Sequence, residues 1–198
     1  MMKKIYDSLP QVVKSLLRQT IKELFPNCII NKIPCIMLRM WYYKYILNIK
    51  IQNNVFIQLG CYIYNSREYF NIGTNTIINR NCILDRRGGL HIGENVNISP
   101  EVAIFTSGHD PQSPSFEERL NPVAIYDHVW LGTRSMIMPG VTIHEGAVIL
   151  PGSVVTQDVE AYKIVGGVPA KVVAERKQGM KYELGKFSNG DSWRPLFM

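Results

Sequence analysis

The chain has 198 residues, of which 46% are hydrophobic and 19% are charged, and its net charge is +6. This composition is typical of a globular protein that buries a core, and no apolar run approaches the ~18 residues of a membrane span. The N-terminus lacks the features of a signal peptide, so we expect a cytoplasmic protein. Its positive charge fits an anionic partner, but the absence of a basic run disfavours nucleic acid.

Residues 1–48 are expected to form a helical cap. Residues 11–24 place their apolar side chains on one helical face and their basic side chains elsewhere. A second helix is predicted over residues 34–47, around Trp41 and three tyrosines. These helices would close the open end of the domain that follows. The alternative is that the basic N-terminal helix makes a weak contact with a membrane surface.

From residue 49 to residue 168 the sequence repeats with a period of six. Aliphatic side chains recur at this spacing in five groups of three, and a small or β-branched residue follows nearly every one of them four positions later. The aliphatic positions are Ile51, Ile57, Ile63, Ile72, Ile78, Leu84, Ile92, Ile98, Ile104, Ile125, Leu131, Ile137, Ile143, Ile149 and Val155. Gly, Asn and Pro crowd the places between them, which favours short strands joined by sharp corners. The pattern predicts a solenoid of about five triangular coils that buries one aliphatic column.

Three insertions interrupt the period, and each follows the third strand of a coil. They are residues 64–71, 85–91 and 105–124. Because equivalent corners of stacked coils lie above one another, we expect the three insertions to emerge at one edge, which is often the binding face of repeat proteins. The longest insertion contains His109. Residues 169–198 are expected to form a short helix, beginning at Pro169, and a tail.

The hexapeptide period, the GHD sequence at Gly108, the HVWLG sequence at 128–132 and the closing segment at 154–173 together resemble the hexapeptide-repeat acyltransferases. The resemblance covers residues 50–175. In particular, the chain is similar to the galactoside and maltose O-acetyltransferases and to relatives that acetylate surface polysaccharides. It implies an all-β fold, a left-handed parallel β-helix, assembled as a homotrimer with acetyl-CoA in a groove between two subunits.

The resemblance also implies roles for individual residues. The catalytic histidine of the family matches His109, and acceptor-binding positions match Asn79, Asp85 and Arg87. The positions that contact the coenzyme match Trp130, Gly132, Thr133, Pro151, Gly152, Thr156, Gln157 and Lys171. The galactoside enzymes carry two acidic residues where this chain has Arg86 and Arg87, so the identity of the acceptor is left open.

These residues suit acetyl transfer from a thioester to a hydroxyl. Histidine is a suitable general base near neutral pH, and a backbone N–H near Gly132 and Thr133 is our candidate donor to the developing oxyanion. We therefore predict an acetyl-CoA-dependent O-acetyltransferase that acts on a sugar or polysaccharide precursor. A nucleotide-sugar N-acetyltransferase and a non-catalytic trimeric β-helix scaffold are the alternatives.

A metal enzyme on the same scaffold is disfavoured. The γ-class carbonic anhydrases bind their metal through three histidines, two of them five residues apart. Here the four histidines, at 91, 109, 128 and 144, are separated by 16 residues or more. We expect no metal, and His91, His128 and His144 are interpreted as surface residues.

Overall fold

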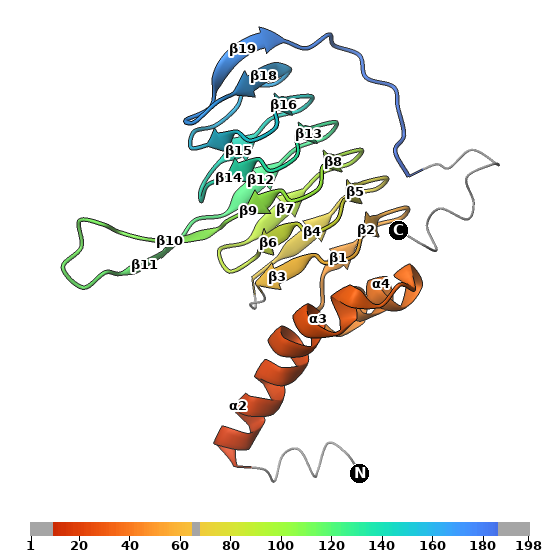
Figure 1. Ribbon diagram of the computed structural model, residues 1–198, viewed down its shortest axis with the longest axis vertical. Helices are drawn as coiled ribbons and strands as arrows, with labels where there is room; N and C mark the ends of the chain where they lie inside the picture. Colours follow the sequence, from red (N-terminus) through yellow and green to blue (C-terminus); the bar gives the residue numbers. More distant parts are fainter. Residues whose placement is uncertain (1–9, 65–67, 186–198) are drawn as a thin grey trace.

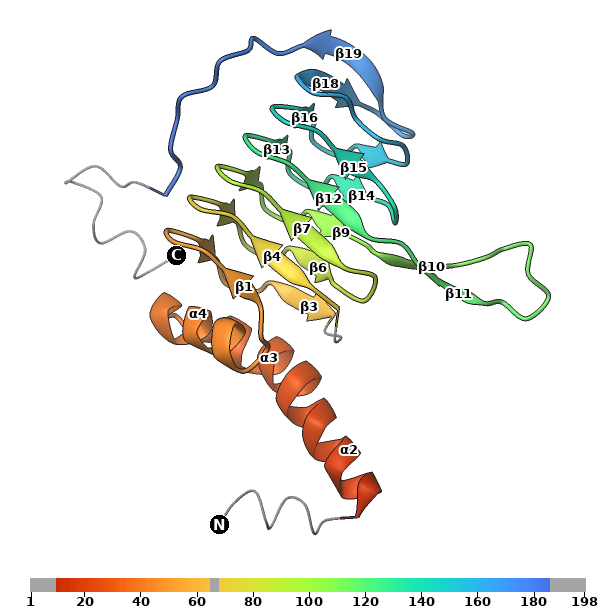
Figure 2. The same cartoon turned by 180° about the vertical axis from the view of Figure 1, so that it is seen from behind.

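A computed structural model describes residues 10–64 and 68–185 of the chain. Its body is a parallel β-helix in which each coil contributes one strand to each of three sheets (Figures 1 and 2). The predicted solenoid is therefore confirmed. Sheet A contains β1 (Lys50–Ile51), β4 (Phe70–Ile72), β7 (Leu90–Ile92), β12 (Val123–Ile125) and β15 (Thr142–Ile143). Sheet B contains β2 (Phe56–Ile57), β5 (Ile77–Ile78), β8 (Asn97–Ile98), β13 (Trp130–Leu131), β16 (Val148–Ile149), β18 (Lys163–Gly166) and β19 (Lys171–Glu175). Sheet C contains β3 (Tyr62–Tyr64), β6 (Ile83–Asp85), β9 (Ala103–Ile104), β14 (Met136–Ile137) and β17 (Val154–Val155). These strands make five complete coils, and a sixth begins with Val159, which bridges to Ile143 of β15, and continues into β18.

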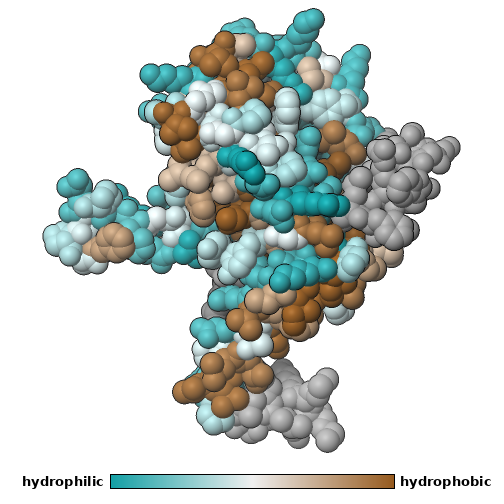
Figure 3. Space-filling view, in the orientation of Figure 1, coloured by the Kyte–Doolittle hydropathy of each residue, from teal (hydrophilic) through white to brown (hydrophobic). Residues whose placement is uncertain are grey.

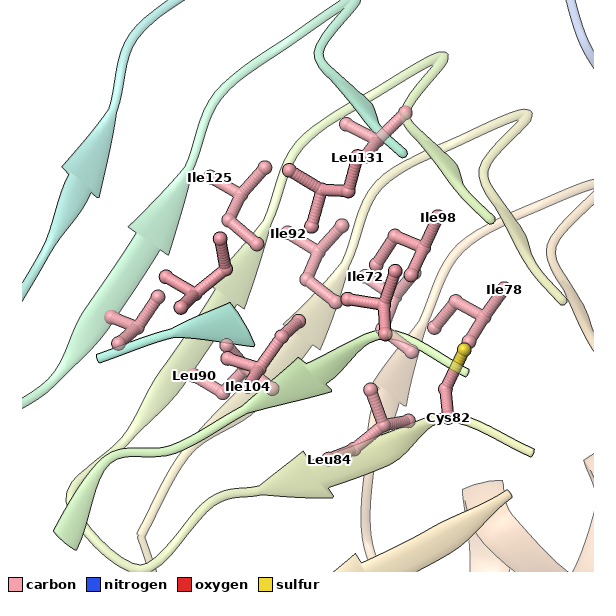
Figure 4. Close-up of a cluster of buried hydrophobic side chains, with 14 of the residues drawn as sticks. Ile72, Ile78, Cys82, Leu84, Leu90, Ile92, Ile98, Ile104, Ile125 and Leu131 are labelled. Atoms are coloured by element: carbon pink, nitrogen blue, oxygen red, sulfur yellow. The ribbon is translucent and has the colours of Figure 1, made fainter. Parts of the chain in front are cut away.

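The core is the predicted aliphatic column. All fifteen aliphatic positions of the period are buried, and their side chains stack from coil to coil inside the solenoid (Figure 4). The small or β-branched residues that follow four positions later, including Cys61 and Cys82, are buried as well. Each buried Ile or Leu contributes about 1.5–3 kcal/mol relative to an exposed one, so this column is the main source of the stability of the fold.

The corners between the sheets repeat as regularly as the strands. We name them by the sheets that they join: AB, BC and CA. Left-handed backbone recurs once per coil at the first two, with positive φ at Asn54, Asn75, Asn95, His128, Gly146 and Tyr162 in the AB corner and at Gly60, Asn81, Glu101, Arg134 and Gly152 in the BC corner. Gly and Asn tolerate this conformation best, which explains why they crowd the places between the strands.

The N-terminal helices close the first coil only in part. They are α2 (Gln11–Gln19), the π-helical turn η1 (Thr20–Leu24), α3 (Phe25–Cys28), the 3-10 turn η2 (Ile30–Lys32) and α4 (Ile36–Tyr45). The amide of Asn27 in α3 exchanges hydrogen bonds of 2.8 and 2.9 Å with the backbone of Ile63, and the buried Arg39 of α4 donates to the carbonyl of Ile57 at 3.1 Å. The predicted cap is therefore formed by α3 and α4, whereas α2 extends away from the solenoid (Figure 1).

The C-terminal helix predicted from Pro169 is wrong. This segment forms β19, which pairs antiparallel with β18, because β18 leaves an unpaired strand edge at the end of the stack and the β-branched Val172 and Val173 suit a strand. The chain then descends along the AB corner, where the Tyr182 hydroxyl donates to the carbonyl of His128 at 3.1 Å. The last thirteen residues, 186–198, lie outside the described part of the chain.

Candidate active site

The CA corner gathers the three insertions, as predicted from the spacing. The N–H of Arg86, in the second insertion, donates to the carbonyl of Tyr64 at the start of the first at 3.2 Å. The N–H of Gly88 donates to the hydroxyl of Thr106 in the third at 2.9 Å. The buried guanidinium of Arg86 also donates to the carbonyl of Leu47 at 2.9 Å, which ties the corner to the N-terminal cap. Residues 65–67 lie outside the described residues.

The third insertion forms a two-stranded arm that projects from this corner (Figures 1 and 2). Strand β10 (Ser107–His109) pairs antiparallel with β11 (Glu118–Leu120), and His109 lies opposite Glu118. At the base of the arm, the N–H of Asn121 donates to the carbonyl of Thr106 at 2.9 Å. The arm is thus held by a regular hairpin ladder, although its sequence departs from the period.

His109 is exposed and held in one orientation. Its Nδ1 lies 2.8 Å from the carbonyl oxygen of Phe116, and its ring stacks on the Phe116 ring with 4.1 Å between centroids and 8° between planes. Because a carbonyl can only accept a hydrogen bond, Nδ1 carries the proton in the neutral ring. The unprotonated Nε2 is then the basic atom, which is the arrangement that a general base needs.

Glu118 connects the arm to the second insertion. Its carboxylate accepts a hydrogen bond of 2.6 Å from the hydroxyl of Ser107 and pairs with Arg87 at 3.3 Å. Directly opposed residues of an antiparallel pair point to the same face, so Glu118 shares a face of the arm with His109. Neither Glu118 nor Phe116 is indicated by the repeat pattern. Phe116 carried a signal, because it is the one aromatic residue of Phe, Tyr or Trp type in the polar stretch 106–122.

Asp85 is fully buried, and its carboxylate is occupied. It accepts from the N–H of Arg87 at 2.9 Å, from the Arg87 guanidinium at 3.0 Å through each of two nitrogens, and from the N–H of Thr106 at 3.1 Å. Burial raises the pKa of Asp85, but the hydrogen bonds and charge of Arg87 and the Thr106 N–H outweigh it and leave the pKa below its usual value. This geometry suits a positioning role for Asp85. Arg87, whose side chain is 37% exposed and lies over the Tyr64 ring, is the member of this pair that reaches solvent.

The residues of the BC corner lie at the other end of sheet C. Asn79, Gly132, Thr133, Pro151 and Gly152 are stacked there, and the N–H of Gly152 donates to the carbonyl of Thr133 at 2.9 Å. Within one chain the structure therefore does not bring them together with His109. The N–H of Gly132 already donates to the carbonyl of Ile149 at 2.8 Å, so Thr133 is the remaining candidate for an oxyanion donor.

Four further predicted positions lie in separate places. Trp130 is 41% exposed on the outer face of sheet B, as its place in the repeat predicts, and its indole N–H donates to the hydroxyl of Ser99 at 3.0 Å. Thr156 and Gln157 are exposed in the CA corner, two coils beyond the arm, and Lys171 is exposed on β19 at the end of the solenoid.

Within residues 10–64 and 68–185, no three His, Cys, Asp or Glu side chains come together as a metal site, and no helix is long and apolar enough to cross a bilayer.

Comparison with known proteins identifies relatives of this chain. Residues 124–157 match the family described as bacterial transferase hexapeptide (six repeats). The chain is 37% identical over 120 residues to galactoside O-acetyltransferase of Escherichia coli, covering 54% of this chain and 57% of that protein. It is 31% identical over 141 residues to the dTDP-4-amino-4,6-dideoxy-D-glucose acyltransferase of Escherichia coli, covering 66% of this chain and 73% of that protein.

Solved structures agree with the sequence matches. A hexapeptide-repeat acetyltransferase of Vibrio cholerae in complex with acetyl-coenzyme A superposes with a TM-score of 0.73 and 26% identity, covering 83% of this chain and 89% of that one. The match to the galactoside enzyme spans little more than half the length of that relative. The extent of the match to the amino-sugar acyltransferase and the shared fold nevertheless settle the family. The chain is a member of the hexapeptide-repeat acyltransferases.

Proposed function

We propose that the chain is an acetyl-CoA-dependent O-acetyltransferase that acetylates a hydroxyl of a sugar or a polysaccharide precursor. The observation that carries this proposal is His109, which is exposed on the arm with Nδ1 hydrogen-bonded to the Phe116 carbonyl and Nε2 left as the base. Two relatives support it. One is named a galactoside O-acetyltransferase, and the structure of another contains acetyl-coenzyme A.

The reaction needs one group that moves a proton. Nε2 of His109 accepts the proton of the acceptor hydroxyl while the oxygen attacks the thioester carbonyl carbon. The C–S bond then breaks, and the His109 imidazolium returns the proton to the departing thiolate. The Phe116 carbonyl stabilises the imidazolium because it accepts a hydrogen bond from Nδ1–H in both protonation states. Arg87, which pairs with Asp85 and Glu118, would contact the acceptor beside the arm.

We further propose that the working unit is a homotrimer in which two copies complete each site. The candidate coenzyme positions of the BC corner and the His109 arm lie at opposite ends of sheet C in one chain. A neighbouring copy would bring its BC corner, with the Thr133 N–H, and the adjoining Trp130 of sheet B to the arm of the first. The sedimentation mass of the purified protein tests this step, and a monomer with full activity contradicts it.

The central test is the substitution His109→Asn. Asparagine keeps a short polar side chain with an N–H donor but removes the base, so we expect turnover to fall by about 10²–10⁴-fold. Release of free CoA thiol from acetyl-CoA in the presence of an active acceptor measures it. The matched control is His144→Asn, which removes another exposed histidine, stacked on Tyr126 in the AB region of the solenoid. Undiminished turnover in His109→Asn rules out this base.

The class of acceptor is to be identified by assaying a panel of candidate acceptors. Sugars, polysaccharide fragments, nucleotide sugars and nucleotide amino sugars are offered with acetyl-CoA, and CoA release is recorded. The match to a relative named as an amino-sugar acyltransferase makes N-acetylation the second candidate. Acetylated product that resists hydroxylamine indicates an amide, whereas product that hydroxylamine cleaves indicates the proposed ester. Absence of turnover with every acceptor, together with absence of acetyl-CoA binding, supports a non-catalytic scaffold.

A further inference from the structure

The N-terminal helices expose a continuous apolar surface that the solenoid does not use. On α2 and η1 it includes Leu16, which is 58% exposed, and Leu24, which is 63% exposed. Figure 3 shows this apolar surface along α2 at the lower end of the molecule. A helix of this length is marginal in water on its own, because most helical stability in proteins comes from packing of the apolar face. The exposed face of α2 therefore needs a covering surface.

Helix α4 extends the same surface. Met37 and Trp41 are 72% and 52% exposed, and Tyr45 lies beside them. A groove of about 500 Å³, lined almost entirely by apolar side chains, joins the two parts, with Ile21 and Phe25 on one side and Trp41 of α4 on the other. Trp and Tyr are enriched where an apolar phase meets water, because their rings are apolar and their tips are polar.

The charge of the chain is concentrated in this same segment. Residues 10–47, which contain the helices, have six Lys or Arg and one Asp or Glu, whereas residues 48–198 have fourteen of each. The described helical segment thus carries an excess of positive charge, and the chain from residue 48 onward is balanced. Lys32 and Lys44 are exposed there, and Lys44 is in the last turn of α4. An apolar face bordered by cations matches an anionic lipid surface, where headgroups attract the cations and acyl chains receive the apolar side chains.

A second copy of the same segment is a poor partner for this surface. Two such segments would bring their excess positive charge together, which opposes association. The solenoid, with its nearly balanced charge, offers little electrostatic attraction in exchange. We propose that α2, η1, α3 and α4 dock the chain on an anionic lipid surface, with the apolar face at the boundary between headgroups and acyl chains.

Vesicle co-sedimentation of the full chain tests the proposal without reference to turnover. We expect the protein to sediment with vesicles of phosphatidylcholine mixed with phosphatidylglycerol, and to remain in solution with phosphatidylcholine alone. Binding should weaken as salt rises, because salt screens the cations. The double variant Leu16→Glu with Leu24→Glu should lower the partition coefficient by about tenfold or more, since it places charges in the apolar face.

The matched control is Val172→Glu, which changes a side chain of similar exposure, 60%, on β19 at the other end of the solenoid. It should bind like the unmodified chain. Equal binding to neutral and anionic vesicles, or no binding to either, overturns the proposal. If the double variant alters the oligomer mass while the unmodified chain ignores vesicles, the surface is instead an interface between protein chains.

Discussion

The BC and CA corners lie at the two ends of sheet C and are built from the same coils, yet they present different chemistry. In the BC corner every turn has the same length and a residue with positive φ, from Gly60 to Gly152. In the CA corner insertions replace the turns of the first three coils, and side chains such as Asp85 and Arg87 hold them together. The regular corner repeats one turn from coil to coil and carries an exposed ion pair between Arg134 and Glu101, whereas the irregular corner is held together by side chains that reach from one insertion to the next.

This difference separates two requirements of the proposed reaction. An extended coenzyme needs a repeated, rigid surface, and a general base needs one side chain held in a defined orientation. Close backbone spacing between coils limits the BC corner at Gly132, whereas the insertions of the CA corner are joined by side-chain hydrogen bonds. Substitutions should therefore affect the two corners through different physical causes.

The largest effect on stability is expected from Gly132→Ala in the BC corner. An added Cβ would lie 2.6 Å from the N of Pro151 and 2.7 Å from the carbonyl oxygen of Ile149, and neither backbone atom can move without shifting the next coil. We expect the free energy of unfolding to fall by about 3 kcal/mol. The matched control is Gly152→Ala, which has open space but a φ of +70°, and should cost about 1–2 kcal/mol. Denaturant unfolding measures both, and the reverse order would show that inter-coil spacing does not limit this corner.

A smaller loss of unfolding free energy is expected from Asp85→Ala in the CA corner. The change leaves the Arg87 guanidinium and the Thr106 N–H without their acceptor. Because Arg87 is about a third exposed and regains water, the cost should be about 2 kcal/mol rather than that of a fully buried pair. Turnover should fall as well, since the base of the arm loosens. Full activity together with unchanged stability would exclude the positioning role of Asp85.

Periodicity made most of this architecture predictable. One aliphatic residue per strand is required to fill the column, so positions such as Ile98 identify the coils, and the stacking of equivalent corners places His109 beside the other insertions. The sequence around Val172 fits a helix or a strand equally well, and the choice depends on the free edge of β18, which is not local. Likewise, the roles of Glu118 and Phe116 depend on hairpin pairing within the arm, which the period does not specify.

The pH dependence of stability should distinguish the corners further. The pKa of Asp85 is lower in the folded chain than its usual value, so its contribution to stability is present above the unfolded carboxyl pKa of about 3.9. That contribution is lost as the pH falls through the lower, folded-state pKa. The variant Asp85→Asn should therefore show a shallower loss of unfolding free energy below about pH 4 than the unmodified chain. Parallel acid unfolding curves for the two proteins would contradict the network around Asp85.

The smallest effect on stability is expected from Phe116→Ala at the end of the arm. Phe116 is exposed, so the free energy of unfolding should change by less than about 0.5 kcal/mol. Its backbone carbonyl still accepts from Nδ1 of His109, but the stacked ring that limits imidazole rotation is lost. We expect kcat to fall about tenfold, with an unchanged KM for acetyl-CoA and an unchanged pH profile, because the base is the same. Phe116→Tyr keeps the ring and should restore kcat. An equal loss in Phe116→Tyr would mean that stacking does not orient His109, and that the irregular corner depends on its hydrogen bonds alone.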